Sequence, residues 1–498
     1  MIEPMHDAAS SPSSTSDPTG AAGPPSSWTL AISSLAVFAV FLDTTVLFVA
    51  FPDIAASFPE VAASELSWVL NGYTIAFAAL LVPLGKVADR RGHKQMFIAG
   101  SIVFTVGSLL CAIAPGPWTL VAARIVQAVG GAALVPSSLA LVLRATPRER
   151  VPVALAIWGA TGAVAGAVGP TLGAALVEVG GWRWVFVINL PVGIATVWLG
   201  RRSLSESRDP ASLLPAALGV VLVIVGAILV SFGLVRGEEL GWTSIGSLGA
   251  VVAGIAVLGL FVLHQSRTAA PTVDLALFAV RNFAWGNAAT VVFSVAFTAM
   301  FLSSILFLTE VWGWSVLKAG FGVAPGPLFV AVLAPGMGVL AARIGQRPLL
   351  VVGGVLFAVG GVLRLVMLDG RSDYVADFLP SMVFTGLGVA LCLPQLSSVI
   401  GQALPPDRLG VGGAVNQALR QFAGTVGVAL TIGLTAGATG LADALVRFDR
   451  VWWVLIIGGL ATTACSFPLR TRAAGAARPG AAGGADGIPL AIVGDSAP

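Results

Sequence analysis

Two stretches that lie 258 residues apart reveal how this chain is organised: GGAALVP at residues 130–136 and GVALCLP at residues 388–394. The same spacing relates AGAVG at residues 165–169 to AGTVG at residues 423–427. Because these matches occur in the same order, we interpret them as an internal repeat. Repeated halves that enclose a site at the middle of the membrane are typical of secondary transporters. The repeat therefore favours transport over a receptor or a membrane-embedded enzyme.

The composition around the repeat indicates a membrane protein. Hydrophobic residues make up 56% of the 498 residues, charged residues 10%, and the mean hydropathy is +0.92. A soluble protein carries roughly 25% charged residues, so this chain has too few charges to form a soluble exterior. Apolar stretches of about 20 residues recur, each long enough to cross the hydrocarbon core. We predict about fourteen transmembrane helices, near residues 29–50, 66–85, 96–115, 118–142, 153–177, 184–200, 213–235, 244–264, 284–309, 318–342, 349–368, 377–401, 409–436 and 450–469.

Repeat and spans together predict an all-α integral membrane protein with two six-helix halves and two inserted helices. The Ser/Pro-rich start and the Ala/Gly/Pro-rich end show no apolar period, so we expect both to be disordered. The predicted parts are a tail at 1–27, a first half at 28–203, the inserted pair at 204–270, a second half at 271–470 and a tail at 471–498.

The Lys and Arg residues predict the orientation, because short cytoplasmic loops carry an excess of them. If both termini are cytoplasmic, eighteen of these residues fall inside: Lys86, Arg90, Arg91, Lys94, Arg144, Arg148, Arg150, Arg201, Arg202, Arg208, Arg267, Arg281, Arg343, Arg347, Arg408, Arg470, Arg472 and Arg478. Six fall outside: Arg183, Arg236, Lys318, Arg371, Arg447 and Arg450. We therefore expect a multi-pass protein of the cell membrane with both termini in the cytoplasm.

The motif GKVADRRGHK at residues 85–94 lies at the inner end of the second predicted helix. Gly85 and Gly92 permit close approach and a tight turn. An acidic residue, Asp89, stands beside Arg90 and close to Lys94, so it can form an ion pair whose rupture would open the cytoplasmic side. The alternative is that the basic residues only determine topology.

Here the sequence resembles the major facilitator superfamily, whose loop after the second helix has this Gly-x-x-x-Asp-Arg-x-Gly form. Arg124, Gln127 and Gly130 match the fourth-helix pattern of that superfamily, although Ala128 replaces a glycine. LDTTVLFVAFP at residues 42–52 and GGWRWVFVINLPVG at residues 180–193 are similar to the fourteen-helix drug:proton antiporter branch. In two places the chain departs from the family pattern, with Phe48 where an Asn is usual and Ala342 where an Asp is common.

A glycine series on the fifth predicted helix resembles the antiporter motif of that superfamily. Its members are Gly159, Gly162, Gly166, Gly169, Pro170 and Gly173. Small residues at this spacing let another helix pack backbone to backbone. The resemblance implies a seam between the halves that limits proton leak, whereas the residues alone are equally compatible with ordinary close packing.

Charged residues at membrane depth are candidates for function, because burying them there is costly. Asp43 stands past the middle of the first predicted helix, beside Thr44 and Thr45, and we expect it to take up and release the coupled proton. Arg124 cannot realistically lose its proton, so we expect it to couple to Asp43 or to substrate. A structural carboxylate and a register-fixing ion pair are the respective alternatives.

The predicted substrate cavity is lined by Gln127, Trp158, Gln417 and Arg420, all at membrane depth. Glu178, Glu310 and Arg364 fall near outer helix ends, where solvation suffices, so we expect structural roles for them. With two basic residues and one acidic residue at depth, we expect neutral or weakly acidic substrates.

These features predict a transporter, not an enzyme, that exports small amphipathic, drug- or antibiotic-like molecules in exchange for protons. Cys111, Cys392 and Cys465 lie far apart, so we expect no metal site and no cofactor. The chain has no phosphate-binding loop, which excludes ATP as the energy source, and its net charge of +3 gives no argument for nucleic acid. We expect a monomer whose partners are substrate, protons and the bilayer. Proton-coupled uptake of a metabolite and a non-transporting sensor are the alternatives.

Overall fold

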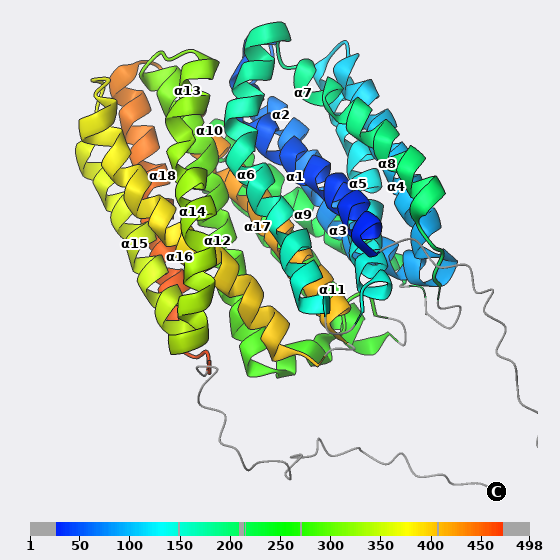
Figure 1. Ribbon diagram of the computed structural model, residues 1–498. Coiled ribbons are helices and arrows are strands. Elements are labelled where there is room, and N and C mark those ends of the chain that lie inside the picture. Colours follow the sequence, from blue (N-terminus) through cyan, green and yellow to red (C-terminus); the bar gives the residue numbers. More distant parts are fainter. Residues whose placement is uncertain are drawn as a thin grey trace, which may run out of the picture.

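The computed structural model describes residues 26–147, 150–208, 214, 216–268, 271–405 and 408–471. Within these ranges every regular element is a helix, and the helices form one bundle (Figure 1). This confirms the predicted all-α class. Apart from residues 26, 27 and 471, the two predicted tails lie outside the described residues.

Each of the fourteen predicted spans overlaps one helical segment. The first six segments are α1 (Ser26–Ser57), α2 (Ala63–Leu66) with α3 (Trp68–Arg91), α4 (His93–Ala112), α5 (Pro117–Ala145), α6 (Val151–Gly180), and α7 (Trp184–Val187) with α8 (Asn189–Ser203). The next elements are α9 (Ala217–Val235), the short α10 (Gly237–Leu240), and η2 (Ile245–Gly249) with α11 (Ala250–Arg267). The last are η3 (Leu275–Ala279), α12 (Arg281–Leu306) with η4 (Phe307–Val311), α13 (Val316–Val323) with α14 (Pro325–Ile344), α15 (Gln346–Met367), η5 (Tyr374–Phe378) with α16 (Leu379–Ala403), α17 (Leu409–Thr435) and α18 (Leu441–Ser466).

Twelve of these segments, counted over the described residues, are long and apolar enough to cross a membrane on their own. The other two of the fourteen are α17 and α18. Both carry charges within the helix, Arg420 in α17 and the pair Asp449 and Arg450 in α18. Their polar residues lower their hydropathy, and they are held in the bundle by packing against α12.

The pairing of helices in the first part of the chain returns in the last part. In the first part α1 packs on α6, α3 on α5, and α4 on both α5 and α8. In the last part α12 packs on α17, α14 on α16, and α15 on both α16 and α18. Glycines make such packing close: a Cβ on Gly130 of α5 would lie 2.8 Å from the Gly100 carbonyl oxygen of α4.

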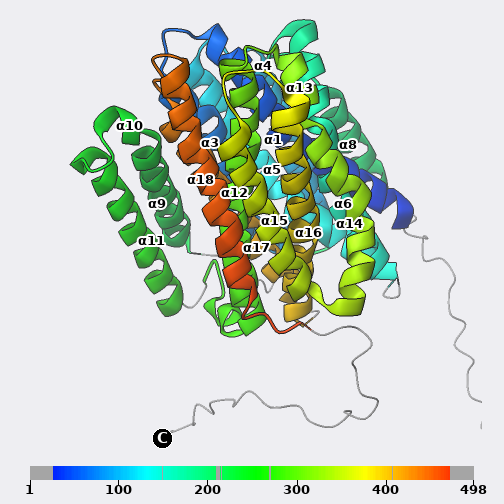
Figure 2. The same ribbon diagram turned by 90° about the vertical axis from the view of Figure 1, so that its left-hand side faces the viewer.

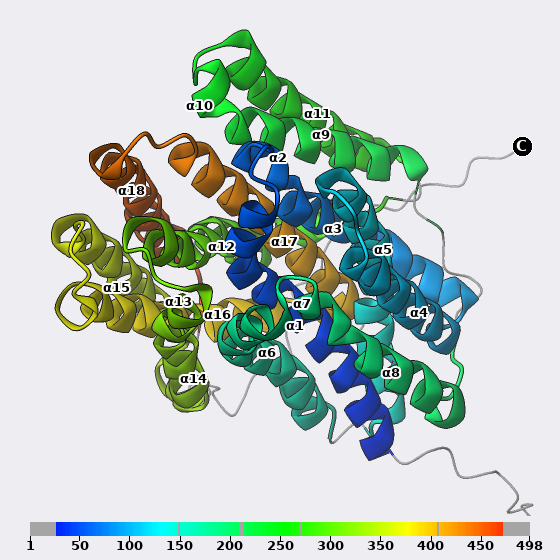
Figure 3. The same cartoon turned by 90° about the horizontal axis from the view of Figure 1, so that it is seen from above.

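The hairpin of α9 and α11 lies against one side of the bundle (Figures 2 and 3). Its two helices pack closely on each other, since a Cβ on Gly254 would lie 2.8 Å from the Val230 nitrogen. Of the pair, α9 contacts both α3 and α17 and so borders the junction between the two parts of the bundle. Most of α11 faces outward, as its exposed apolar residues show.

The two ends of the bundle differ in charge. We call the end with the loop between α3 and α4, at Gly92, the basic end, and the end with α2, α7, α10 and α13 the opposite end (Figure 1). Near the opposite end the two halves touch: a Cβ on Gly320 of α13 would lie 2.9 Å from the Pro170 carbonyl oxygen of α6. Nearby, the rings of Phe48 on α1 and Phe301 on α12 are 5.6 Å apart.

Candidate functional site

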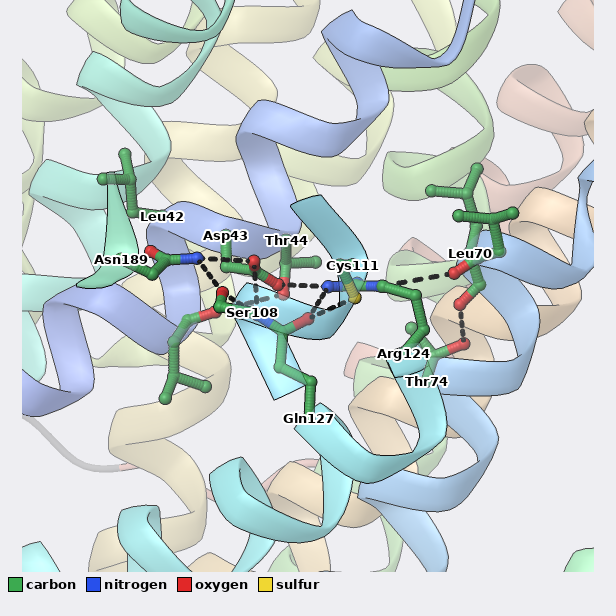
Figure 4. A network of polar contacts seen from close by, with 12 residues as sticks. Leu42, Asp43, Thr44, Leu70, Thr74, Ser108, Cys111, Arg124, Gln127 and Asn189 are labelled. Carbon is green, nitrogen blue, oxygen red and sulfur yellow. Dashed lines mark hydrogen bonds and ion pairs between the residues drawn. The ribbon is translucent and has the colours of Figure 1, made fainter. Parts of the chain in front are cut away.

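A buried carboxylate on α1 is the centre of the most polar cluster inside the first half (Figure 4). Asp43 is 2% exposed, and its Oδ2 lies 2.5 Å from Nη1 of Arg124 on α5. Its Oδ1 accepts hydrogen bonds from Gln127 Nε2 and Asn189 Nδ2, both at 2.8 Å. Both carboxylate oxygens are therefore satisfied without water, as a buried charge requires.

The Arg124 guanidinium is equally enclosed, at 1% exposure. Besides Asp43, its Nη1 donates to Gln127 Oε1 at 2.6 Å, and its Nε donates to the Val69 carbonyl oxygen at 3.4 Å. The guanidinium carbon lies 3.9 Å from the centre of the Tyr73 ring. Stacking of this kind stabilises a cation away from water. The ion pair between α1 and α5 is therefore also contacted by α3, through Val69 and Tyr73, and by α8, through Asn189.

Two members of this cluster are not among the residues that the sequence singled out. Ser108 Oγ on α4 accepts from Gln127 Nε2 at 2.8 Å and from Asn189 Nδ2 at 2.9 Å. Asn189 lies inside the stretch 180–193. An amide side chain within an apolar run is a sequence feature that could have identified it as a buried polar residue. Ser108 carried none, because small hydroxyl residues are common in transmembrane helices and bond to their own backbone.

The predicted cavity residues do not all lie together. Gln127 belongs to the Asp43 cluster, whereas Trp158 on α6 donates from Nε1 to Ser138 Oγ at 3.1 Å and packs on the apolar cluster that also contains Tyr73. Gln417 and Arg420 are on α17, in the second half, and have no interaction with the Asp43 cluster.

The loop motif at residues 85–94 ends α3 and begins α4. Gly92 has φ +121°, which favours glycine, and a Cβ there would lie within 3.0 Å of the Glu206 carboxyl group. Glu206 accepts from the backbone nitrogens of Lys94 and Gln95 at 3.0 and 3.1 Å, at the positive end of α4. The segment after α8 thus braces this loop, which sequence reasoning did not foresee.

One charged residue of that motif, Asp89, contacts His93. Asp89 Oδ1 lies 3.4 Å from His93 Nε2, whereas Arg90 is exposed. Gly85 faces α5, where a Cβ would be 3.4 Å from Pro136 Cβ.

The glycine series on α6 faces mainly α1. A Cβ on Gly162 would lie 3.2 Å from Phe41, one on Gly173 would lie 3.0 Å from Val46, and one on Gly169 would collide with Thr45 Oγ1. Gly166 has no atom within 4 Å of its Cβ position. The seam between the halves involves Pro170, whose carbonyl oxygen approaches Gly320.

The expectation that Arg364 is solvated at a helix end is wrong. Its side chain is 0% exposed and donates from Nη1 to Ser304 Oγ at 2.7 Å. It lies over the rings of Phe378 and Trp452, at 5.1 and 5.0 Å from their centres, and no carboxylate of the described residues pairs with it. Distance from a helix end predicts depth in the membrane but not whether neighbouring helices cover the side chain. Glu178 and Glu310 are exposed, as expected.

Two similarly packed helical halves with a buried ion pair at membrane depth define a multi-pass secondary transporter. The sequence profile of the Major Facilitator Superfamily matches residues 33–263 and 211–428. The chain belongs to this superfamily, whose members transport small molecules across membranes.

Several relatives of the chain are resistance proteins. The multidrug resistance protein Stp of Mycobacterium tuberculosis is 33% identical over 404 residues, covering 81% of this chain and 74% of Stp. The methylenomycin A resistance protein of Streptomyces coelicolor is 31% identical, over 84% of this chain and 88% of that protein. The tetracenomycin C resistance and export protein of Streptomyces glaucescens is 30% identical, over 85% and 80%.

Solved structures support the fold. A peptide transporter POT in complex with sulfate aligns with a TM-score of 0.63 at 16% identity, over 89% of this chain and 94% of that one. The human organic anion transporter MFSD10 aligns with a TM-score of 0.58 at 16% identity, over 88% and 100%.

Proposed function

We propose that this protein exports small amphipathic, drug- or antibiotic-like molecules across the cell membrane in exchange for protons. The observation that carries the proposal is the dry pair of Asp43 and Arg124 inside the first half. Asp43 is a carboxylate buried at membrane depth and paired with a cation, and ionisable side chains at that depth are candidates for function. Relatives that align along four fifths of the chain are named as resistance and export proteins.

The proposed export and the orientation of the chain together give the path of the substrate. The basic end carries most of the Lys and Arg residues of the loops, so it faces the cytoplasm with both termini. Substrate enters from that side and leaves at the opposite end. A monomer contains the whole site, and the ion gradient replaces ATP as the energy source.

Proton uptake by Asp43 breaks its ion pair with Arg124 and so loosens the contact between α1 and α5. The neutral acid no longer attracts Arg124, while Arg124 keeps its charge and must find another partner. When a carboxylate oxygen of Asp43 carries a proton, that oxygen becomes a hydrogen-bond donor. Asp43 then accepts hydrogen bonds from Gln127 and Asn189 less well than the carboxylate does. Since α1 touches the second half through Phe48, a shift of α1 reaches the closed contact at the opposite end.

The glycine face of α6 seals the proton site from its neighbours. Gly169 lies directly on Thr45, two residues after Asp43, and Thr45 Oγ1 also donates to the Ala165 carbonyl oxygen at 3.3 Å. Backbone contact of this kind leaves no space for water between Gly169 and Thr45, which restricts proton leak at that point.

The loop between α3 and α4 acts as a cytoplasmic brace. Glu206 fixes the start of α4, and the pair of Asp89 and His93 fixes the end of α3 to it. Opening and closing of the basic end therefore requires this loop to move as a unit with the segment after α8.

The test is proton movement in inside-out vesicles that hold an established pH gradient. Cationic, neutral and acidic amphipaths are added to wild type, to Asp43→Asn and to Asp377→Asn, a matched control near the opposite end. Collapse of the gradient with wild type and the control, but not with Asp43→Asn, is the expected result. Equal collapse with Asp43→Asn would remove Asp43 from the coupling mechanism.

A further inference from the structure

Arg420 stands near the middle of α17, about 16 Å along the helix from Leu409 at 1.5 Å per residue. Around it, α17 contacts two helices. Thr425 Oγ1 donates to Thr74 Oγ1 of α3 at 2.7 Å, and Asn416 Nδ2 donates to Asn287 Oδ1 of α12 at 2.9 Å. Arg420 lies on the arc of the helix between these two contacts.

The opposite side of α17 faces the inserted pair. Successive residues turn by about 100°, so Gly433 falls on the far side of the helix from Arg420. Gly433 packs on Leu234 of α9, which lies outside the two halves (Figure 3). Arg420 therefore points away from α9 and lies on the face of α17 that is turned toward α12.

That face of α17 packs on α12 two turns after Arg420, where a Cβ on Gly427 would lie 2.5 Å from the Val295 carbonyl oxygen, but it borders open space toward the basic end. Gly413, two turns before Arg420 on the same face, has no atom within 4 Å of its Cβ position. Arg420 is partly exposed and has no hydrogen-bond or ion-pair partner among the described residues. One turn away, the Gln417 Nε2 atom is buried and also lacks a partner.

The repeat makes this arginine unusual. At the spacing of 258 residues Arg420 corresponds to Gly162 of α6, which packs flat on Phe41 of α1. The helix face that carries glycines in the first half thus carries Arg420 and Gln417 in the second half. Arginines at this depth usually pair with a charge or a carbonyl group or face a water-filled cavity, and the carboxylate of the first half, Asp43, is already paired with Arg124.

We propose that Arg420 and Gln417 form an anion-binding subsite that recognises the carboxylate of an amphipathic substrate. The planar guanidinium presents paired N–H donors that match the two oxygens of a carboxylate, and Gln417 adds a third donor. The apolar part of the substrate then extends into the space between the halves. This inference rests on the proposed export function and specifies its substrate class.

The test uses two probes of nearly equal shape, N-dansyl-phenylalanine and its neutral amide. Binding to the purified full chain is followed by dansyl emission, so the readout does not depend on transport. We expect wild type to bind the acid at least tenfold more tightly than the amide. Arg420→Gln should abolish this preference with little change for the amide, and Arg420→Lys should retain part of it.

Arg343→Gln, which removes an exposed arginine near the basic end, is the matched control and should keep the preference. Equal binding of acid and amide by wild type, or an acid preference that survives Arg420→Gln, overturns the subsite. Acid binding that depends on Arg420 but releases no proton through Asp43 contradicts the exchange mechanism and leaves the subsite standing.

A second, independent observation concerns the loop of the inserted pair at the opposite end. On one side, Arg236 Nη2 lies 3.4 Å from Glu65 of α2, and Glu239 accepts a hydrogen bond from Ser64. On the other side, Glu238 lies 3.0 Å from Arg447 and 3.4 Å from Arg450 of α18. The three residues 236, 238 and 239 thus connect the first half to the second.

We infer that residues 236–239 form an ionic clasp that holds the opposite end closed and opens once in each transport cycle. The clasp gives the hairpin of α9 and α11 a role in transport. Like the anion-binding subsite, this inference rests on the proposed export function. The reporter is Val49→Cys, a buried position on α1 beside Gly320, in a chain whose native cysteines are replaced by alanine. Cells are labelled with a membrane-impermeant maleimide.

Glu238→Gln and, separately, Arg447→Gln should each raise the labelling rate of the reporter at least threefold. The control Arg371→Gln, an exposed residue outside the clasp, should not change it. If both clasp variants are labelled at the same rate as the chain without a clasp substitution, the inference is overturned. The labelling rate measures only how accessible Val49→Cys is, so that result would leave the proposed export function untouched.

Discussion

The interaction of Asp43 with Arg124 predicts an unequal response to the loss of either partner. Asp43→Asn leaves a guanidinium that is fully enclosed and cannot lose its proton. Arg124→Leu leaves a carboxylate that still accepts from Gln127 and Asn189 and can become neutral by binding a proton. Asp43→Asn should therefore destabilise the fold more than Arg124→Leu does.

The magnitude follows from the burial of the pair. Removing one partner of a buried ion pair costs about 3–5 kcal/mol, whereas replacing both by neutral groups is often close to neutral. We expect about 3 kcal/mol of coupling between the two positions. The double variant Asp43→Asn/Arg124→Leu should then unfold at a higher temperature than the single variant Asp43→Asn.

The assay is thermal unfolding of the purified protein with a fluorogenic maleimide. Cys111 and Cys392 are buried, and Cys111 Sγ lies 3.8 Å from Gln127 Oε1, so it reports directly on this cluster. Additive losses in the double variant, or equal unfolding temperatures for the two single variants, would refute the reasoning.

Three further predictions concern packing and bracing. In the α6 series, Gly169→Ala should lower both the unfolding temperature and the export rate, because a Cβ there meets Thr45. Gly166→Ala should leave the unfolding temperature unchanged, because its Cβ position has no atom within 4 Å. Thermal unfolding and vesicle transport are measured for both variants. Glu206→Gln should weaken the start of α4 by about 1 kcal/mol, since two backbone donors at a positive helix end lose a charged acceptor, and faster hydrogen exchange at the α4 N-terminus would show it. Arg364→Met should keep or raise the unfolding temperature, because a buried arginine without a carboxylate gives way to an apolar side chain; a clear loss of stability would assign Arg364 a partner that its contacts do not reveal.

The helices and the ion pair were predictable because both leave strong marks in the sequence. Apolar stretches long enough to span a bilayer set the positions of the helices, and each predicted span overlaps an observed segment. Asp43 and Arg124 stood out because charges are rare at that depth, and the structure places them 2.5 Å apart.

The remainder of the site depends on how helices face one another, which periodicity alone does not determine. Ser108 and Asn189 are ordinary polar residues until α4 and α8 bring them to Asp43. Glu206 acts through a segment without regular structure, and Arg364 is covered by side chains from three other helical segments. None of these relations has a fixed spacing in the sequence.

In the proposed mechanism Asp43 binds and releases the proton that is exchanged for substrate. The direct measurement is proton release by purified protein in weakly buffered solution when a transported amphipath is added. Wild type and Asp377→Asn should release protons as substrate binds, and Asp43→Asn should release none. Equal release by Asp43→Asn would contradict the account.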